Sequence, residues 1–182
     1  MTRAMLTYRD YEALPSDGRR YEIHDGELSV TPAPAPKHQI VSLNLVRALL
    51  QHVPSVAPGQ LLYAPLDVIL ADNTIVQPDI VYLAPDRLHL ISRRGIEGPP
   101  TLAVEILSPS TRTIDRVTKH RLYARYRVPN LWLIDPDARV IEAFTLRTDQ
   151  YALTSRAAGA DPLDLPPFTG LRLIPDALWP ER

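Results

Sequence analysis

The chain has 182 residues, of which 45% are hydrophobic and 23% charged, and its net charge is −1. This length suits one domain with a sizeable core, and the composition excludes disorder, collagen and coiled coil as its main description. The absence of cysteine excludes disulfides, thiolate zinc sites and a cysteine nucleophile. No apolar run approaches the ~18 residues of a membrane helix and no signal peptide is visible, so we expect a cytoplasmic protein without membrane contact.

The first third of the chain predicts a helix, a hairpin and a longer helix. Residues 7–14 are typical of a short helix, and residues 21–30 of a hairpin around an Asp-Gly turn. The proline-rich segment 31–36 is a rigid connector. It leads to a helix over 37–53 that is apolar on more than half of its circumference, and we therefore expect that helix to be largely buried.

The middle of the chain predicts strands. A strand over 66–70 is followed by a turn and by a second strand within 74–83. Pro78 removes a ladder donor from that segment, so it should lie at a strand start, an edge or a bulge. A third strand, over 101–107, is almost continuously apolar and is interrupted by one charge, Glu105.

The C-terminal part predicts one more helix and a second hairpin. A Ser-Pro-Ser-Thr segment caps a helix over 112–127. A buried strand over 131–134 and an alternating strand over 139–147 flank an Asp-Pro-Asp turn. The proline-rich tail, about 158–182, is expected to wrap the surface.

Taken in order, these elements predict a single domain over residues 1–182, with its core in about 20–150. Helices intervene between runs of strands that are themselves mostly antiparallel. The predicted class is therefore α/β or α+β, with one mixed sheet flanked by helices.

Three residues stand out as candidates for chemistry. Asp79 follows a proline at a strand, Glu105 interrupts an apolar strand, and Lys119 lies on the next helix. An unpaired buried carboxylate is expensive, so Glu105 indicates a metal, a cation or a chemical role. Two carboxylates from neighbouring strands suit a hard cation such as Mg²⁺, and a lysine can position water or stabilise charge on a phosphoryl group. This combination suits metal-dependent hydrolysis of phosphodiesters.

Each candidate also has a structural interpretation. Asp79 could accept backbone hydrogen bonds at a turn, and Glu105 could pair with an arginine. Lys119 follows Asp115 by four residues, the favoured order for a solvated helical ion pair. The same helix carries a basic cluster that would either contact a phosphate backbone or form a solvated face. Its candidate nucleic-acid-binding residues are Arg112, Arg116, Arg121 and Arg125.

Several motifs carry a resemblance to a known family. The most specific is Glu-Ile-Leu-Ser-Pro-Ser-Thr at 105–111, followed by Trp-Leu-Ile-Asp-Pro at 132–136. Further matching positions are 21–28, 38, 77–80, 115, 119 and 123. At these residues the chain resembles the PD-(D/E)XK nuclease superfamily and, within it, the Uma-type restriction endonuclease family. The resemblance covers roughly residues 5–150.

The resemblance implies a restriction-endonuclease-like mixed sheet and a set of site residues. Asp79, Glu105 and the backbone carbonyl of Ile106 would hold Mg²⁺ or Mn²⁺. Lys119 would take the place of the catalytic lysine, which usually stands two residues after the acid, where this chain has Leu107. Supporting positions would be Glu22, His38 and Tyr123.

The sequence thus predicts a metal-dependent endonuclease that hydrolyses DNA. A homodimer is implied by the same resemblance, because two sites most simply cut two strands. The alternative is a catalytically silent module of the same fold that binds nucleic acid or a protein partner, with Asp79 and Glu105 occluded and far apart. A third interpretation, a hydrolase of small phosphoesters, would require a closed pocket of modest volume.

Overall fold

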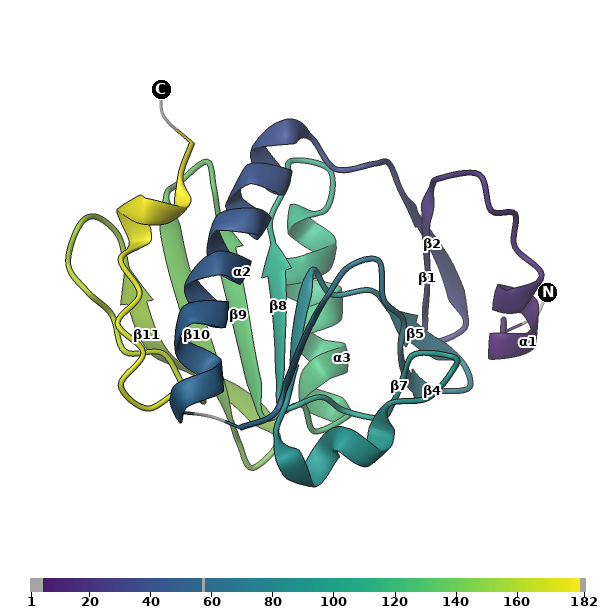
Figure 1. The fold of residues 1–182 in the computed structure, drawn as a ribbon. Coiled ribbons are helices and arrows are strands. Elements are labelled where there is room, and N and C mark those ends of the chain that lie inside the picture. Colours follow the sequence, from purple (N-terminus) through teal and green to yellow (C-terminus); the bar gives the residue numbers. More distant parts are fainter. Residues whose placement is uncertain (1–4, 57, 181–182) are drawn as a thin grey trace.

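The structure is a computed structural model, and it describes residues 5–56 and 58–180. Two β-sheets and their helices make up the molecule (Figure 1). In chain order the elements are α1 (Tyr8–Glu12), β1 (Arg20–His24), β2 (Glu27–Thr31), α2 (Pro36–Val56), β3 (Gln60–Tyr63), β4 (Val68–Ala71), β5 (Thr74–Val76), β6 (Ile80–Leu83), η1 (Pro85–Leu90), β7 (Ile96–Glu97), β8 (Leu102–Ile106), η2 (Ile114–Lys119), α3 (His120–Arg125), β9 (Asn130–Asp135), β10 (Val140–Arg147), β11 (Gln150–Ala157) and η3 (Pro175–Leu178).

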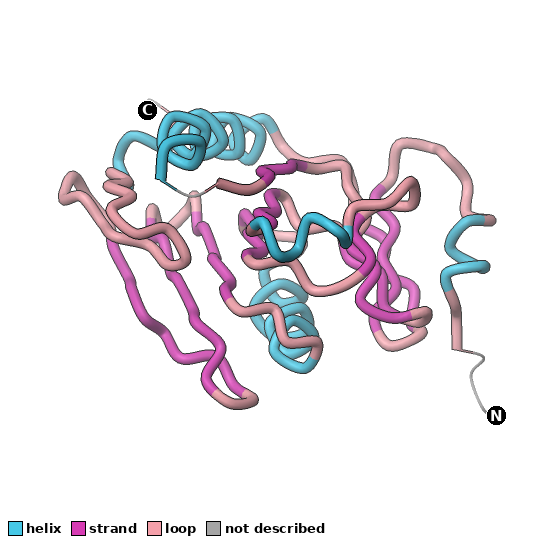
Figure 2. Tube along the Cα trace, turned by 60° about the horizontal axis from the view of Figure 1, so that its bottom comes forward, coloured by secondary structure: helices cyan, strands magenta, loops and turns pink. Residues whose placement is uncertain are grey.

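The larger sheet has six strands in the order β11-β10-β9-β8-β6-β3. Its strands are antiparallel except β8 and β9, which are parallel and are joined through η2 and α3. Helix α2 covers one face and α3 the other, as the end-on view shows (Figure 2). Because both faces are covered, β8 and β9 are apolar along almost their whole length.

The smaller sheet has five strands in the order β2-β1-β5-β4-β7. It begins with the hairpin expected from the sequence, in which Asp25 and Gly26 have φ of 54° and 82°. Positive φ at both positions is what a two-residue type I′ turn requires. One face of this sheet packs near α1, and the other contributes to the core around α3, so α3 lies between the two sheets.

The segment 74–83 departs from the prediction of one strand in one sheet. It forms β5 and β6, which belong to different sheets and are separated by Gln77-Pro78-Asp79. Pro78 therefore lies between strands, where no ladder donor is needed. The backbone N–H of Asp79 donates to the Val104 carbonyl at 3.0 Å, which ties this junction to β8. The two sheets thus meet at Asp79.

Helix α2 is less buried than its composition predicts. Its buried stripe is Val41, Leu45, Leu49 and Val53, at four-residue spacing. On the outer side Leu43 and other large apolar side chains are exposed, because the six-stranded sheet covers only one side of the helix. Over residues 5–56 and 58–180, no helix is both long and apolar enough to span a bilayer.

The helix predicted over 112–127 contains an irregular segment that the sequence does not signal. Residues Ile114–Lys119 form a π-helix, in which the N–H of His120 bonds to the carbonyl of Asp115. A π-turn holds one residue more than an α-turn, and such segments are frequent at functional sites. Here it precedes α3 and ends on Lys119.

The C-terminal tail lies within the core and does not merely wrap the surface. Its buried apolar side chains are Leu165, Phe168, Leu171, Leu173, Leu178 and Trp179. The ring of Phe168 packs edge-on against Tyr82 and Trp132, at centroid distances of 4.8 and 5.8 Å. The tail therefore completes the core between the six-stranded sheet and α2.

Phe168→Ala is expected to lower the free energy of unfolding by about 3–5 kcal/mol, the usual cost of emptying a buried aromatic site. Urea denaturation would measure it, with the adjacent exposed Thr169→Ala as the control. A loss below about 1 kcal/mol, within the range of an ordinary surface substitution, would show that the tail is not integral to the core.

Candidate active site

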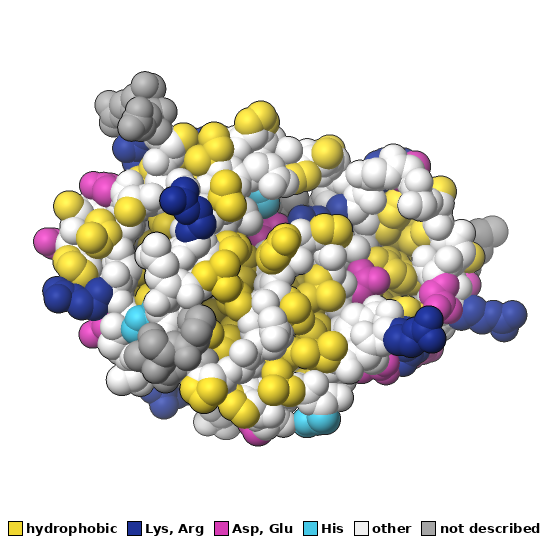
Figure 3. Space-filling model, viewed as in Figure 1, with side chains coloured by type: hydrophobic (Ala, Val, Ile, Leu, Met, Phe, Trp, Pro, Cys, Tyr) yellow, Lys and Arg dark blue, Asp and Glu magenta, His cyan; other side chains and the backbone are white. Residues whose placement is uncertain are grey.

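A cavity of about 280 Å³ opens where the two sheets meet. Its walls are the proline-rich connector 32–35 and the loop 108–111. Histidine, acidic and basic side chains lie at the bottom of a hollow between α2 and the N-terminal hairpin (Figure 3). The charged and titratable residues that line the cavity are Arg20, Glu22, His38, Asp79, Glu105, Asp115 and Lys119.

Asp79 is held by three donors. Its Oδ2 accepts the Ile106 N–H at 2.8 Å and lies 3.1 Å from His38 Nε2. Its Oδ1 accepts from Arg20 at 3.1 Å. Burial alone would raise the pKa of this carboxyl, but His38, Arg20 and the Ile106 N–H lower it below its ordinary value. Asp79 is therefore ionised at neutral pH.

Glu105 faces the opposite side of β8 from its neighbours Val104 and Ile106, which pack on the α2 side. Lys119 Nζ lies 3.1 Å from both of its carboxylate oxygens, and the Tyr123 hydroxyl donates to Oε1 at 2.5 Å. Burial raises the pKa of Glu105 well above its ordinary value, and the neighbouring carboxylates add to the rise although Lys119 opposes it. Burial thus outweighs the attraction of Lys119 for the charged form of Glu105.

Lys119 is enclosed by carboxylates. Its Nζ lies 2.8 Å from Glu22, 3.1 Å from Glu105 and 3.5 Å from Asp115. Burial would lower the pKa of the lysine, but these three carboxylates raise it above its ordinary value. Lys119 therefore stays protonated and serves as a positive charge beside these carboxylates.

Glu22 reaches the site from β1. Side chains alternate along a strand, so Arg20, Glu22 and His24 face the same side. The backbone N–H of Gln77 donates to Glu22 Oε1 at 2.5 Å, and His24 Nε2 lies 3.4 Å from Oε2. Although burial would raise the pKa of Glu22, Lys119 and His24 lower it to about 2.

The structure brings six of the sequence-predicted residues together: Asp79, Glu105, Lys119, Glu22, His38 and Tyr123. The helical pair of Asp115 and Lys119 exists, but it is buried at 3% and 2% exposure and not solvated. Sequence reasoning missed Arg20. The alternation of β1 offered the signal, because Glu22 places Arg20 on the same face.

Three of the four arginines predicted to contact nucleic acid are paired with acidic side chains. Arg112 pairs with Asp135 at 2.6 Å, and Arg116 pairs with Glu142 at 2.7 Å. Arg125 pairs with Asp25 in the hairpin turn. In the part of the chain that the structure describes, Arg121 is the member of this set without an acidic partner, and it is exposed.

The donor set fits a hard divalent cation. Four carboxylates line the cavity against the two cations Arg20 and Lys119. Burial is the main cause of the raised pKa of Glu105, and the other three carboxylates add to it. Within residues 5–56 and 58–180, no three His, Asp or Glu side chains are spaced as a ready-made metal site. Two carboxylates, a backbone carbonyl and several waters would still suit Mg²⁺, which binds few protein ligands.

The fold is that of a restriction-endonuclease-like nuclease. It matches the crystal structure of a putative nuclease belonging to DUF820 from Anabaena variabilis ATCC 29413, with a TM-score of 0.77 and 21% identity over 95% of this chain and 97% of the other. The Uma2 family, described as "Putative restriction endonuclease", matches residues 8–176. The chain belongs to this family. No curated protein matches it. Family and fold together support a nuclease.

Proposed function

We propose that the protein is a divalent-metal-dependent nuclease that hydrolyses DNA phosphodiester bonds. The observation that carries this proposal is the meeting of Asp79, Glu105 and Lys119 at one cavity. The catalytically silent alternative predicts that no cavity reaches Asp79 and Glu105, whereas both line this one, at 3% and 1% exposure.

Asp79, Glu105 and the Ile106 carbonyl would hold Mg²⁺ or Mn²⁺. When bound, such an ion would polarise the phosphoryl oxygen and lower the pKa of a bound water. Lys119, permanently charged, stabilises the negative charge that develops on the phosphoryl oxygens. The water oxygen would bond to phosphorus as the bond to the 3′-oxygen breaks. The water would release one proton to solvent and the 3′-oxygen would take one from solvent, which leaves a 3′-hydroxyl and a 5′-phosphate.

The remaining buried groups position these three. His38 and Arg20 fix the two oxygens of Asp79. Tyr123 orients Glu105 through its hydroxyl. Side chains that are already held in position lose little entropy when the transition state forms, so a hydrogen-bonded network of this kind supports catalysis.

Cleavage of supercoiled plasmid with Mg²⁺ or Mn²⁺ tests the proposal. We expect EDTA to abolish cleavage and Asp79→Asn to slow it about 10³-fold, because a catalytic metal contributes several kcal/mol and each 1.36 kcal/mol is tenfold. The exposed Asp161→Asn is the matched control. Equal cleavage by wild type and Asp79→Asn would refute the assignment.

The size of the cavity favours a second candidate, a hydrolase of small phosphoesters. At about 280 Å³, the cavity lies just below the ~300–1,000 Å³ of ordinary ligand pockets. Turnover of bis(p-nitrophenyl) phosphate, compared with that of an oligonucleotide, separates the two activities. A preference for the small ester would replace the nuclease assignment.

Two further expectations belong to the same proposal. A homodimer would let two sites cut the two strands of a duplex. Sedimentation velocity, run with and without DNA, measures that state directly. Cytoplasmic location is the expectation for an enzyme that meets DNA inside the cell.

A further inference from the structure

The catalytic groups lie at the bottom of a narrow recess. Asp79, Glu105 and Lys119 are 3%, 1% and 2% exposed. The cavity above them, about 280 Å³, has room for roughly nine waters at ~30 Å³ each. Its two walls contain prolines, at 32, 34 and 109, which fix φ and limit how far the walls can yield.

A narrow recess should admit a single DNA strand more easily than a duplex. Over the size of this site a duplex is stiff, with a persistence length of ~50 nm, so turning one of its phosphates into a pocket carries a cost in bending energy. A second backbone also follows within ~6 Å across the minor groove. A single strand rotates about its backbone bonds and can turn one phosphate inward.

We infer that the substrate is single-stranded DNA, either free or as an unpaired segment of a duplex. This inference rests on the proposed nuclease function and names the form of its substrate.

A continuous path leads away from the cavity along one face of the helix. Ile114 lines the cavity and also a neighbouring groove of about 460 Å³, to which Thr118 and Arg121 contribute from the helix, and the acidic Asp25 and Glu27 from the hairpin. Arg121 in turn lines a further groove of about 650 Å³, together with Arg125 and Tyr151. Ile114 and Arg121 are seven residues apart, about two helical turns, so a strand that leaves the cavity along this face passes Arg121.

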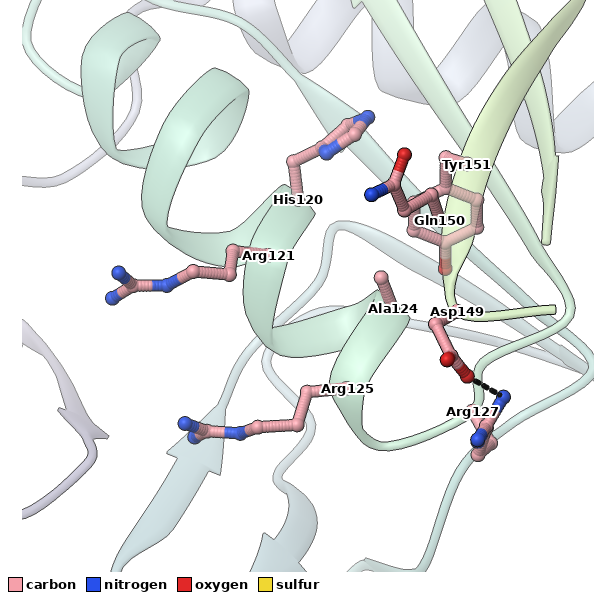
Figure 4. Close-up of a pocket in the computed structure, with 8 residues that line it drawn as sticks. All are labelled: His120, Arg121, Ala124, Arg125, Arg127, Asp149, Gln150 and Tyr151. Carbon is pink, nitrogen blue, oxygen red and sulfur yellow. Dashed lines mark ion pairs between the residues drawn. The ribbon is translucent and has the colours of Figure 1, made fainter. Parts of the chain in front are cut away.

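The charges along this path point to one main phosphate contact. Arg121 and Arg125 extend in the same direction from α3, whereas Arg127 turns toward Asp149 (Figure 4). Arg125 is already paired with Asp25, and Arg127 with Asp149. Among the described residues, Arg121 is the cation on this path without an acidic partner, so it is free to bind a phosphate.

The test compares binding of one labelled oligonucleotide as a single strand and as a blunt duplex, by fluorescence anisotropy in EDTA. Wild type should bind the single strand at least about fivefold more tightly. Arg121→Ala should weaken that binding about three- to tenfold and flatten its log–log salt slope by about 0.7, the value for one phosphate contact on a single strand. Arg172→Ala, exposed on the C-terminal tail, is the matched control.

Equal or tighter binding of the duplex would overturn the inference, as would an Arg121→Ala variant that behaves like the control. Cleavage of the same two oligonucleotides with Mn²⁺ is scored separately. Faster cutting of the duplex would also overturn it. Selective single-strand binding without cleavage of either form would refute the nuclease function and leave the inferred binding surface standing.

Discussion

Lys119→Ala should lower the free energy of unfolding by about 3–5 kcal/mol at neutral pH, because removing one partner of a buried ion pair leaves its counter-charge uncompensated. Here three buried carboxylates share the ammonium, at 2.8, 3.1 and 3.5 Å. The chain's other lysine, Lys37, forms an exposed pair with Asp137 and is the matched control. Lys37→Ala should cost less than about 1 kcal/mol.

The deficit of Lys119→Ala should depend on pH. Burial would raise the pKa of Glu22, but Lys119 and His24 hold it at about 2, below its ordinary value of 4.5. A depressed carboxyl pKa adds stability above the ordinary value, and this stability is lost as the pH falls toward the depressed one. The variant lacks most of that contribution, so its deficit should be largest above pH 4.5 and shrink between pH 4.5 and 2. Urea melts across that range measure it, and a deficit that stays constant would contradict this origin.

The expected loss of stability affects how the cleavage activity of Lys119→Ala is interpreted. A loss of cleavage in Lys119→Ala is informative only where the variant is folded, which circular dichroism at the assay temperature would establish. Lys119→Arg keeps the positive charge but not the compact ammonium geometry. We expect it to retain more stability than Lys119→Ala while still losing cleavage.

Local sequence patterns were sufficient to predict most elements of the fold. The Asp-Gly hairpin, the apolar strand around Glu105 and the long helix all follow from turn chemistry and periodicity. The division of the strands between two sheets does not, because pairing across a break at Pro78 depends on distant partners. The π-segment and the buried tail also lack a local signal, since side chains elsewhere in the chain stabilise them.

The candidate site was predictable in composition more than in arrangement. Residue type and order indicated Asp79, Glu105 and Lys119, and the structure places them around one cavity. The burial of Asp115 was not predictable, because a carboxylate four residues before a lysine is ordinarily a solvated pair. The excess of carboxylates over cations emerges only when both sheets and the helix are placed together.

Because Glu105 is buried among an excess of carboxylates, we expect Glu105→Gln to lower cleavage and to raise stability. We expect cleavage to fall about 10³-fold, as for any loss of several kcal/mol of metal-assisted catalysis. We expect the free energy of unfolding to rise, since burial raises the pKa of Glu105 and the folded state therefore disfavours its charged form. The amide keeps the shape of the side chain and removes a buried charge that its surroundings disfavour. The exposed Glu12→Gln is the matched control.

The sign of the pH dependence shows whether the gain in stability of Glu105→Gln comes from removing a buried charge or from a general packing effect. The folded state holds the proton of Glu105 above its ordinary pKa of 4.5, so wild-type stability falls as the pH rises past that value. The glutamine variant escapes this fall, so its advantage should open above pH 4.5 and grow toward neutrality. Mn²⁺ should reverse the order by binding wild type alone, with a gain of about 2.7 kcal/mol at 100 times its Kd. A variant that is less stable than wild type without metal, or equally stabilised by Mn²⁺, would show that Glu105 is a structural acid rather than a strained metal ligand.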